Sequence, residues 1–206
     1  MLTTLPNLLT LSRICAIPVV IAAFYLETPW SNWVALAFFV GAGLTDLLDG
    51  HLARLFNQVS GFGRFLDPVA DKLLVAATLL MLVHRDHITG LAIFPTLIIL
   101  CREIMVSGLR EYLAELRVGL PVSRLAKWKT VQQMVAIGFL IVGEAGWNRL
   151  PVVEIGLIGL WIAAGLTLYT GYDYLRLGLS HMGEEPPDQQ AQPGVKPGAS
   201  RSAAAE

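Results

Sequence analysis

Long apolar blocks separated by short polar breaks dominate this chain of 206 residues. Each block approaches the ~20 residues that an α-helix needs to cross the hydrocarbon core of a bilayer. Turn-forming residues, among them Gly61, Gly63 and Pro121, mark the breaks. The pattern predicts six helices, at about 8–26, 32–55, 66–84, 88–112, 127–145 and 152–176. We therefore expect an all-α polytopic membrane protein with about six transmembrane helices.

The composition agrees with this expectation. Hydrophobic residues make up 54% of the chain and charged residues 15%, which excludes an ordinary soluble domain. Cys15 and Cys101 both lie in apolar blocks, so we expect two buried, unpaired cysteines. The net charge of −1 indicates no particular partner, and no nucleic acid is expected to bind.

The distribution of basic residues predicts the orientation of the helices. The loops on one side contain only Arg85 and Arg149. Because cytoplasmic loops are enriched in lysine and arginine, the opposite side is predicted to be cytoplasmic, together with both termini. The basic residues on that side are Arg54, Arg64, Arg110, Arg117, Arg124, Lys127, Lys129 and Arg176.

The last part of the chain differs in composition. Residues 183–206 are rich in Pro, Gln, Ala, Gly and Ser and have almost no large apolar side chains. Such a segment cannot bury enough surface to offset the entropy lost on ordering. We therefore expect a membrane domain at 1–182 and a disordered cytoplasmic tail at 183–206.

Four aspartates lie at the junction of the second and third blocks. Asp46 and Asp49 are three residues apart, and Asp67 and Asp71 are four apart, so each pair shares one helix face. Two ionised carboxylates ~4 Å apart repel by about 4 kcal/mol at an effective dielectric constant near 20. Either cations hold the group together or some members are protonated. Hard oxygen ligands beside a membrane favour Mg²⁺ or a similar ion, often with a phosphorylated substrate.

Small residues accompany these acids. Gly50 and Ala53 follow the first pair, and Gly63 precedes the second, which would let a bulky group approach the backbone. An alternative is an ion-pair network in which the aspartates are neutralised by Arg54, Arg64 and Lys72. Pro68 fits a helix only if the third helix begins near Phe65, because proline is tolerated in a first turn.

A second polar group lies farther along the chain. Arg102 and Arg110 are eight residues apart and project within roughly 80° of each other on a helix. Lys127 and Lys129 open the next helix on the same side of the membrane. These cations predict a pocket for an anionic group, since arginine offers paired donors to phosphate. The alternative for Arg102 is pairing with a nearby glutamate or extension toward the interface.

The spacing D-x2-DG-x2-AR-x8-G-x3-D-x3-D resembles the signature of the CDP-alcohol phosphatidyltransferase family. Here it comprises eight fixed positions within 26 residues: Asp46, Asp49, Gly50, Ala53, Arg54, Gly63, Asp67 and Asp71. The resemblance implies a homodimeric membrane enzyme of about six helices with a polar cavity on the cytoplasmic side. It also implies two divalent ions, Mg²⁺ or Mn²⁺, that bind the pyrophosphate of CDP-diacylglycerol. An alcohol then displaces CMP.

The resemblance also implies roles for individual residues. Asp46, Asp49, Asp67 and Asp71 would bind the metals, with Asp71 also the general base. The CDP moiety would contact Asn7, Thr10, Asp46, Gly50, Ala53, Arg54 and Gly63. Asn7 and Thr10 have an alternative role as caps of the first helix. The phosphate of the acceptor would be held by Arg102, Arg110, Lys127 and Lys129.

Further segments are similar to one branch of the family, whose members use sn-glycerol 3-phosphate as the acceptor. These segments are PNLLTLSRI, CREIMVSGLREYLAEL and LAKWKTVQQMVA. Inositol phosphate, or phosphatidylglycerol as in cardiolipin synthesis, remains an alternative acceptor. A cation transporter that uses the aspartates as an ion site is an alternative of another class, although no repeat of the kind common in transporters is seen.

Overall fold

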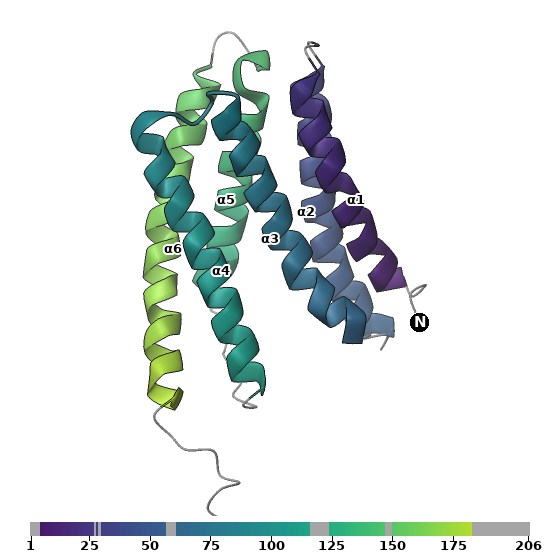
Figure 1. Cartoon of the computed structure of the whole chain (residues 1–206), viewed down its shortest axis with the longest axis vertical. Coiled ribbons are helices and arrows are strands. Elements are labelled where there is room, and N and C mark those ends of the chain that lie inside the picture. The colour runs from purple at the N-terminus through teal and green to yellow at the C-terminus, as the bar shows by residue number, and fades with distance from the viewer. Residues whose placement is uncertain are drawn as a thin grey trace, which may run out of the picture.

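The computed structural model describes residues 5–26, 28, 30–56, 61–115, 124–146 and 150–182. Side chains at 5–7, 46–56, 61–65, 115, 124, 126–127 and 177–182 lie outside this description. Within the described residues the chain forms six α-helices (Figure 1). They are α1 (Leu5–Tyr25), α2 (Ser31–Phe56), α3 (Gly61–His84), α4 (Ile93–Glu115), α5 (Arg124–Val142) and α6 (Val152–Met182). Two short 3₁₀ turns, η1 (Gly90–Ala92) and η2 (Gly143–Ala145), join the longer elements.

The helices run alternately up and down, so α1 begins and α6 ends at the same end of the bundle (Figure 1). We call this the lower end. Packing is most extensive between α1 and α2 and between α5 and α6. Further contacts join α1 to α3, α2 to α5 and α4 to α6. The aspartate helix α3 packs mainly against α1 and has smaller contacts with α2, α4 and α5.

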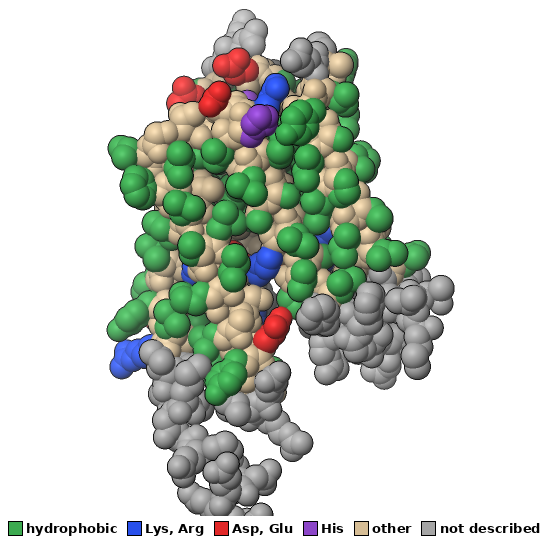
Figure 2. All heavy atoms as spheres, viewed as in Figure 1, with side chains coloured by type: hydrophobic (Ala, Val, Ile, Leu, Met, Phe, Trp, Pro, Cys, Tyr) green, Lys and Arg blue, Asp and Glu red, His purple; other side chains and the backbone are tan. Residues whose placement is uncertain are grey.

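Apolar side chains lie both inside and outside the bundle. The interior contains large buried residues, among them Phe24, Phe39, Leu82, Ile99 and Leu160. Many equally apolar side chains face outward, which is typical of helices that contact lipid. Figure 2 shows hydrophobic side chains spread over the visible face, with the acids gathered mainly near the upper end. Three helical segments are long and apolar enough to cross a membrane: Leu8–Tyr25, Gly90–Ala114 and Val152–Arg176.

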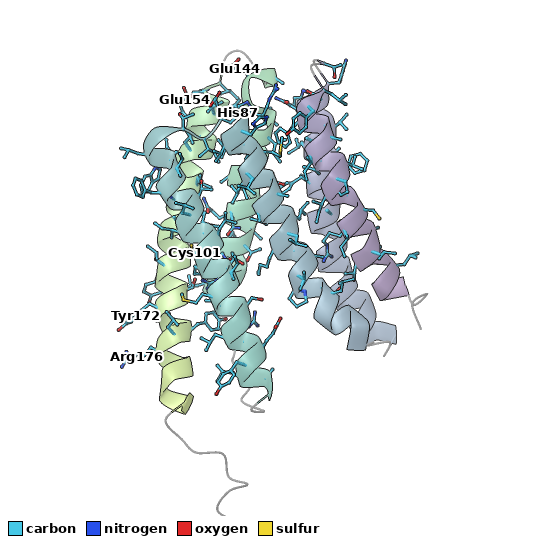
Figure 3. All side chains as sticks on the ribbon, viewed as in Figure 1. His87, Cys101, Glu144, Glu154, Tyr172 and Arg176 are labelled. Atoms are coloured by element: carbon cyan, nitrogen blue, oxygen red, sulfur yellow. The ribbon has the colours of Figure 1, made fainter. Side chains whose placement is uncertain are left out.

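The remaining helices contain no apolar stretch of that length among the residues that the structure describes. In α2 the apolar stretch Ser31–Thr45 is shorter, and the side chains after it are not described. Polar residues mark both ends of the bundle: His87, Glu144 and Glu154 lie near the upper end, whereas Tyr172 and Arg176 lie toward the lower end (Figure 3). This is the arrangement expected of a membrane protein with several helical spans.

Two details differ from the sequence predictions. The helix α3 begins at Gly61 rather than near Phe65, so Pro68 lies in its interior. Because proline has no backbone N–H, the carbonyl of residue 64 loses its usual donor within the helix. Cys15 and Cys101 are unpaired, as expected, but they are exposed rather than buried. In a membrane protein an apolar stretch need not be buried, because apolar side chains can also face lipid.

Candidate active site

The two described aspartates of α3 lie on one face and meet the side chains of α1. The hydroxyl of Thr10 donates a hydrogen bond to Oδ1 of Asp67. One helical turn further along, Nη1 of Arg13 lies 2.8 Å from Oδ1 of Asp71. The matched order of these contacts shows that α1 and α3 run in the same direction. The prediction that Asp67 and Asp71 share one face is confirmed.

Arg13 is the side chain in this region that the sequence reasoning missed. Only 1% of its side chain is exposed. Its Nε also donates to the carbonyl oxygen of Ala42 in α2, at 3.3 Å. Arg13 thereby ties α1 to both neighbouring helices. The signal was present in the sequence, because a lone arginine in an apolar helix marks a functional site by default.

Other residues near this face are only partly described. Thr10 is buried, and Thr45 donates a hydrogen bond to the Ala42 carbonyl oxygen at 2.8 Å. Thr45 and Arg13 both line a cavity of about 530 Å³ between α1 and α2. The predicted site residues whose side chains lie outside the described part are Asn7, Asp46, Asp49, Gly50, Ala53, Arg54 and Gly63.

The predicted four-aspartate group therefore stays a prediction. Among the side chains that are described, no three His, Cys, Asp or Glu residues come close enough together to hold a metal ion. The backbone places the C-terminal end of α2 and the start of α3 at the same lower end of the bundle (Figure 1). Asp46 and Asp49 belong to that part of α2.

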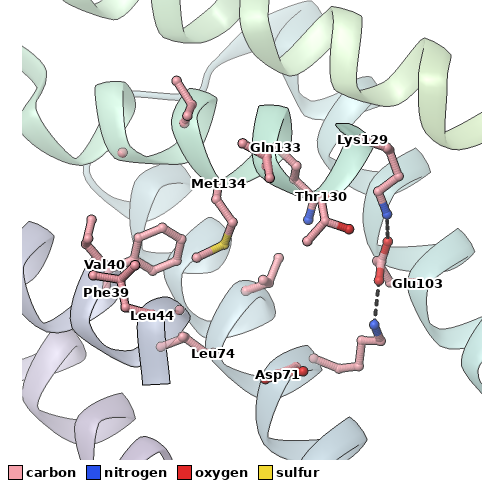
Figure 4. Close-up of a pocket in the computed structure, with 16 residues that line it drawn as sticks. Phe39, Val40, Leu44, Asp71, Leu74, Glu103, Lys129, Thr130, Gln133 and Met134 are labelled. Carbon is pink, nitrogen blue, oxygen red and sulfur yellow. Dashed lines mark hydrogen bonds and ion pairs between the residues drawn. The ribbon is translucent and has the colours of Figure 1, made fainter. Parts of the chain in front are cut away.

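A group of charged residues connects α3, next to Asp71, with α4 and α5. Glu103 of α4 is at its centre, with Oε2 2.6 Å from Nζ of Lys72 in α3. Its other oxygen, Oε1, contacts Nζ of Lys129 in α5 and lies 3.4 Å from Nη1 of Arg102. We call these four residues the Glu103 cluster. Figure 4 shows the contact between Lys129 and Glu103 as a dashed line.

The cluster brings together two of the four cations that the sequence predicted for one pocket. Arg102 and Lys129 share Oε1 of Glu103, so the glutamate pairing that was the alternative for Arg102 is present. Lys72, which the alternative ion-pair network paired with the aspartates, joins them. The side chain of Lys127 lies outside the described part of the chain.

The C-terminal helix α6 holds the arginines of α4 from the other side. The hydroxyl of Thr170 accepts a hydrogen bond from Nη2 of Arg102 at 3.0 Å. The ring of Tyr174 lies 5.7 Å from the Arg102 guanidinium carbon and 5.9 Å from that of Arg110. Cation–π attraction at such distances holds both guanidinium groups against one ring. Arg102 and Arg110 therefore do face the same neighbour, as their spacing predicted.

Gly171 makes this close approach possible. A methyl group at Gly171 would lie 3.0 Å from Cγ of Arg102 and 3.2 Å from its Nε. These distances are tighter than ordinary contacts, so a larger residue would displace the arginine. Neither Gly171 nor Tyr174 was singled out in the sequence, since their relation to Arg102 depends on how α4 and α6 pack.

One cavity joins the aspartate face to the Glu103 cluster. It has a volume of about 480 Å³ and lies among α2, α3, α4 and α5. Its apolar wall includes Phe39, Leu74 and Met134 (Figure 4). The polar lining consists of Asp71, Lys72, Glu103, Lys129, Thr130 and Gln133. A cavity with acids and cations on one side and apolar groups on the other suits a ligand that is itself amphipathic.

The sequence matches the family described as CDP-alcohol phosphatidyltransferase over residues 3–169. The chain belongs to this family. The matched segment includes α1 to α5, the aspartates of α3, the Glu103 cluster and most of α6. The last part of α6, with Thr170, Gly171 and Tyr174, lies after the matched segment.

Curated relatives are similar over most of their length. A CDP-diacylglycerol–glycerol-3-phosphate 3-phosphatidyltransferase of Rickettsia bellii is 48% identical, with 84% of this chain and 93% of the relative covered. Proteins of the same name from Haemophilus influenzae and Cereibacter sphaeroides are 43% and 38% identical. The alignment with the Haemophilus influenzae protein covers 84% of this chain and 92% of the relative. The alignment with the Cereibacter sphaeroides protein covers 88% of this chain and 98% of the relative.

Proposed function

We propose that this CDP-alcohol phosphatidyltransferase transfers the phosphatidyl group of CDP-diacylglycerol to sn-glycerol 3-phosphate, giving phosphatidylglycerophosphate and CMP. The observation that carries the proposal is the cavity with Asp71 at one part of its lining and two cations of the Glu103 cluster, Lys72 and Lys129, at another. An acid that can accept a proton and cations that can hold a phosphate thus face one space. The names of the curated relatives support the same reaction.

The proposed metals are two divalent ions, Mg²⁺ or Mn²⁺, held by Asp46, Asp49, Asp67 and Asp71. The donor set fits, because these ions prefer oxygen ligands and the described pair Asp67 and Asp71 presents carboxylates from one helix face. When bound, such ions neutralise charge on the phosphate oxygens and on the departing group. The CDP moiety would contact Asn7, Thr10, Asp46, Gly50, Ala53, Arg54 and Gly63.

Asp71 is the proposed general base. The side chain is 34% exposed and lines the cavity, while Arg13 holds one of its oxygens. In the reaction, Asp71 accepts the proton of the acceptor hydroxyl, and the hydroxyl oxygen forms a bond to the phosphorus next to diacylglycerol. The bond from that phosphorus to the bridging oxygen breaks, and CMP leaves. Arg13 keeps the carboxylate oriented throughout.

The proposed acceptor pocket uses Arg102, Arg110, Lys127 and Lys129 to hold the phosphate of sn-glycerol 3-phosphate. Arg102 and Lys129 already meet at Glu103, and Arg110 shares the ring of Tyr174 with Arg102. A neutral alcohol would not need so many cations. A phosphorylated one would, because a phosphomonoester carries about −1.5 to −2 charges at pH 7.

The proposed location is the inner membrane, with both termini and the active site facing the cytoplasm. The up-and-down path supports this orientation, since it brings the last residues of α4 and the first residues of α5 to the end where α1 begins and α6 ends (Figure 1). Arg176 lies toward that lower end (Figure 3), and lysine and arginine are enriched on the cytoplasmic side of membrane proteins. A homodimer remains part of the proposal.

An acceptor screen tests the proposed function. Purified protein in detergent is mixed with CDP-diacylglycerol, Mg²⁺ or Mn²⁺, and one acceptor at a time, and CMP release is measured. We expect release with sn-glycerol 3-phosphate and at most a small fraction of it with inositol phosphate, phosphatidylglycerol or serine. A preference for inositol phosphate or phosphatidylglycerol would assign the chain to another branch. No CMP release with any alcohol would contradict transferase activity.

Replacing Gly171 by alanine should raise the KM for sn-glycerol 3-phosphate about three- to thirtyfold. The added methyl group would press on Arg102 and displace its guanidinium, weakening contacts that are each worth about 1.5–3 kcal/mol. The KM for CDP-diacylglycerol should stay within about twofold. Gly165→Ala is the matched control on the same helix, because nothing lies within 4 Å of the methyl group it adds. Equal changes in the KM for sn-glycerol 3-phosphate in the two variants would show that Gly171 has no specific role at the acceptor pocket.

A further inference from the structure

Glu103 forms ion pairs with two of the cations that the proposed function assigns to the acceptor phosphate, Arg102 and Lys129. Both of its oxygens are engaged, one by Lys72 and the other by Lys129 and Arg102. Its side chain is 11% exposed and that of Lys129 only 3%, so water screens these charges little. Within the four described members of the cluster, three positive charges and one negative charge leave a residual charge of +2.

That residual charge equals the charge of a phosphomonoester dianion in size and is opposite in sign. The acceptor phosphate carries about −1.5 to −2 charges at pH 7. The product of the proposed reaction still carries the same phosphomonoester. Without Glu103, the three cations of the cluster would therefore hold the product as firmly as they capture the acceptor. Release of the product would then become slow.

We propose that Glu103 is a specificity-determining counter-ion, which keeps the cluster at a charge that captures a phosphate dianion and still releases it. This inference rests on the proposed function and extends it. The carboxylate pairs with Lys72, Arg102 and Lys129 and offsets one of their three charges when the pocket is empty, and it competes with the phosphate when the pocket is filled. Since Lys72 is next to Asp71 in α3, the same carboxylate also fixes the distance between the acceptor pocket and the proposed base.

The test is Glu103→Gln, which keeps the shape of the side chain and removes its charge. One unit charge about 5 Å from a phosphate changes its binding constant by at least about tenfold at an effective dielectric constant near 20. We expect the KM for sn-glycerol 3-phosphate and the inhibition constant of inorganic phosphate each to fall about tenfold or more. We also expect kcat to fall, because the product leaves more slowly.

Two further variants are matched to this one. Glu111→Gln removes the same charge from an exposed position on α4 and should leave both constants unchanged. Glu103→Asp keeps the charge and should restore an inhibition constant for inorganic phosphate close to that of the unmodified protein. If Glu103 only holds the helices together, the KM for sn-glycerol 3-phosphate should be unchanged or raised in Glu103→Gln.

The outcomes separate this inference from the proposed function. An unchanged or weaker inhibition by phosphate in Glu103→Gln overturns the inference even if the enzyme remains active. If Glu103→Gln is too unstable for kinetic measurements, the midpoint of its thermal unfolding is measured with and without inorganic phosphate. Rescue by phosphate supports a counter-ion role, and no rescue overturns it. An unmodified protein that releases no CMP with sn-glycerol 3-phosphate contradicts the proposed function, and the phosphate-dependent unfolding then still tests Glu103.

Discussion

The Asp71→Asn variant should lose phosphatidyl transfer by about 10²- to 10⁴-fold while remaining folded in detergent. This is the usual contribution of a positioned general base. The amide keeps an oxygen that can accept the hydrogen bond from Arg13, so the contact between α1 and α3 survives in part. The loss should appear in kcat, with the KM for sn-glycerol 3-phosphate changed by less than about threefold. CMP release under saturating substrates measures it.

The control for this variant is Asp173→Asn, which removes the same charge from an exposed position on α6. We expect it to keep full activity. Full activity in Asp71→Asn would remove that residue from the role of base. If Asp71→Asn does not fold, Asp71→Glu is measured in its place. This variant keeps the carboxylate but moves it by one methylene group, and it should retain part of the rate of transfer.

Replacing Arg13 by methionine should lower kcat by about 10- to 100-fold. The buried guanidinium holds Asp71 and the Ala42 carbonyl at once, and a misplacement of about 1 Å in a reacting group can cost 10²-fold. Methionine fills similar space without charge, so packing between α1 and α2 changes little. The KM for both substrates should change less than kcat, since the proposed role of Arg13 is to orient the base.

Two comparisons sharpen this test. Arg13→Lys keeps the charge but lacks the planar fork of donors, so it should recover only part of the rate. Arg85→Met removes a cation from the exposed turn at the upper end and should have no effect. If Arg13→Met keeps the full rate, Asp71 is oriented by something other than α1.

Much of the fold could be predicted from the apolar pattern. Six helices were expected, and the described residues form six, most with bounds within a few positions of those predicted. Periodicity also placed Asp67 and Asp71 on one face, and Arg102 and Arg110 against one neighbour. These relations are local, because they depend only on spacing along a single helix.

The rest depends on which helices meet. Nothing in the spacing indicates that Arg13 pairs with Asp71, 58 positions away, or that Thr170 meets Arg102 across 68 positions. The alternative that paired Lys72 with the aspartates could not be judged from spacing either, and the partner of Lys72 is Glu103 in α4. The start of α3 was wrong because a rule about proline in isolated helices was applied to a helix that packs on its neighbours.

Lipid accounts for the error at the cysteines. In a soluble protein an apolar stretch is buried, whereas here many large apolar side chains of every helix face outward. Hydrophobicity therefore indicates a membrane span and does not say which face meets the protein interior. The prediction of a disordered tail at 183–206 falls outside the described residues.

Binding of Mn²⁺ tests the central claim most directly. Purified protein is titrated with Mn²⁺ in the presence and absence of CDP-diacylglycerol, and the free ion is followed by electron paramagnetic resonance. We expect the unmodified protein to take up two ions per chain, and Asp67→Asn to lose at least one of them while Asp173→Asn binds both. Equal binding by all three proteins, or no binding by the unmodified one, would contradict a metal site built on the aspartates of α2 and α3.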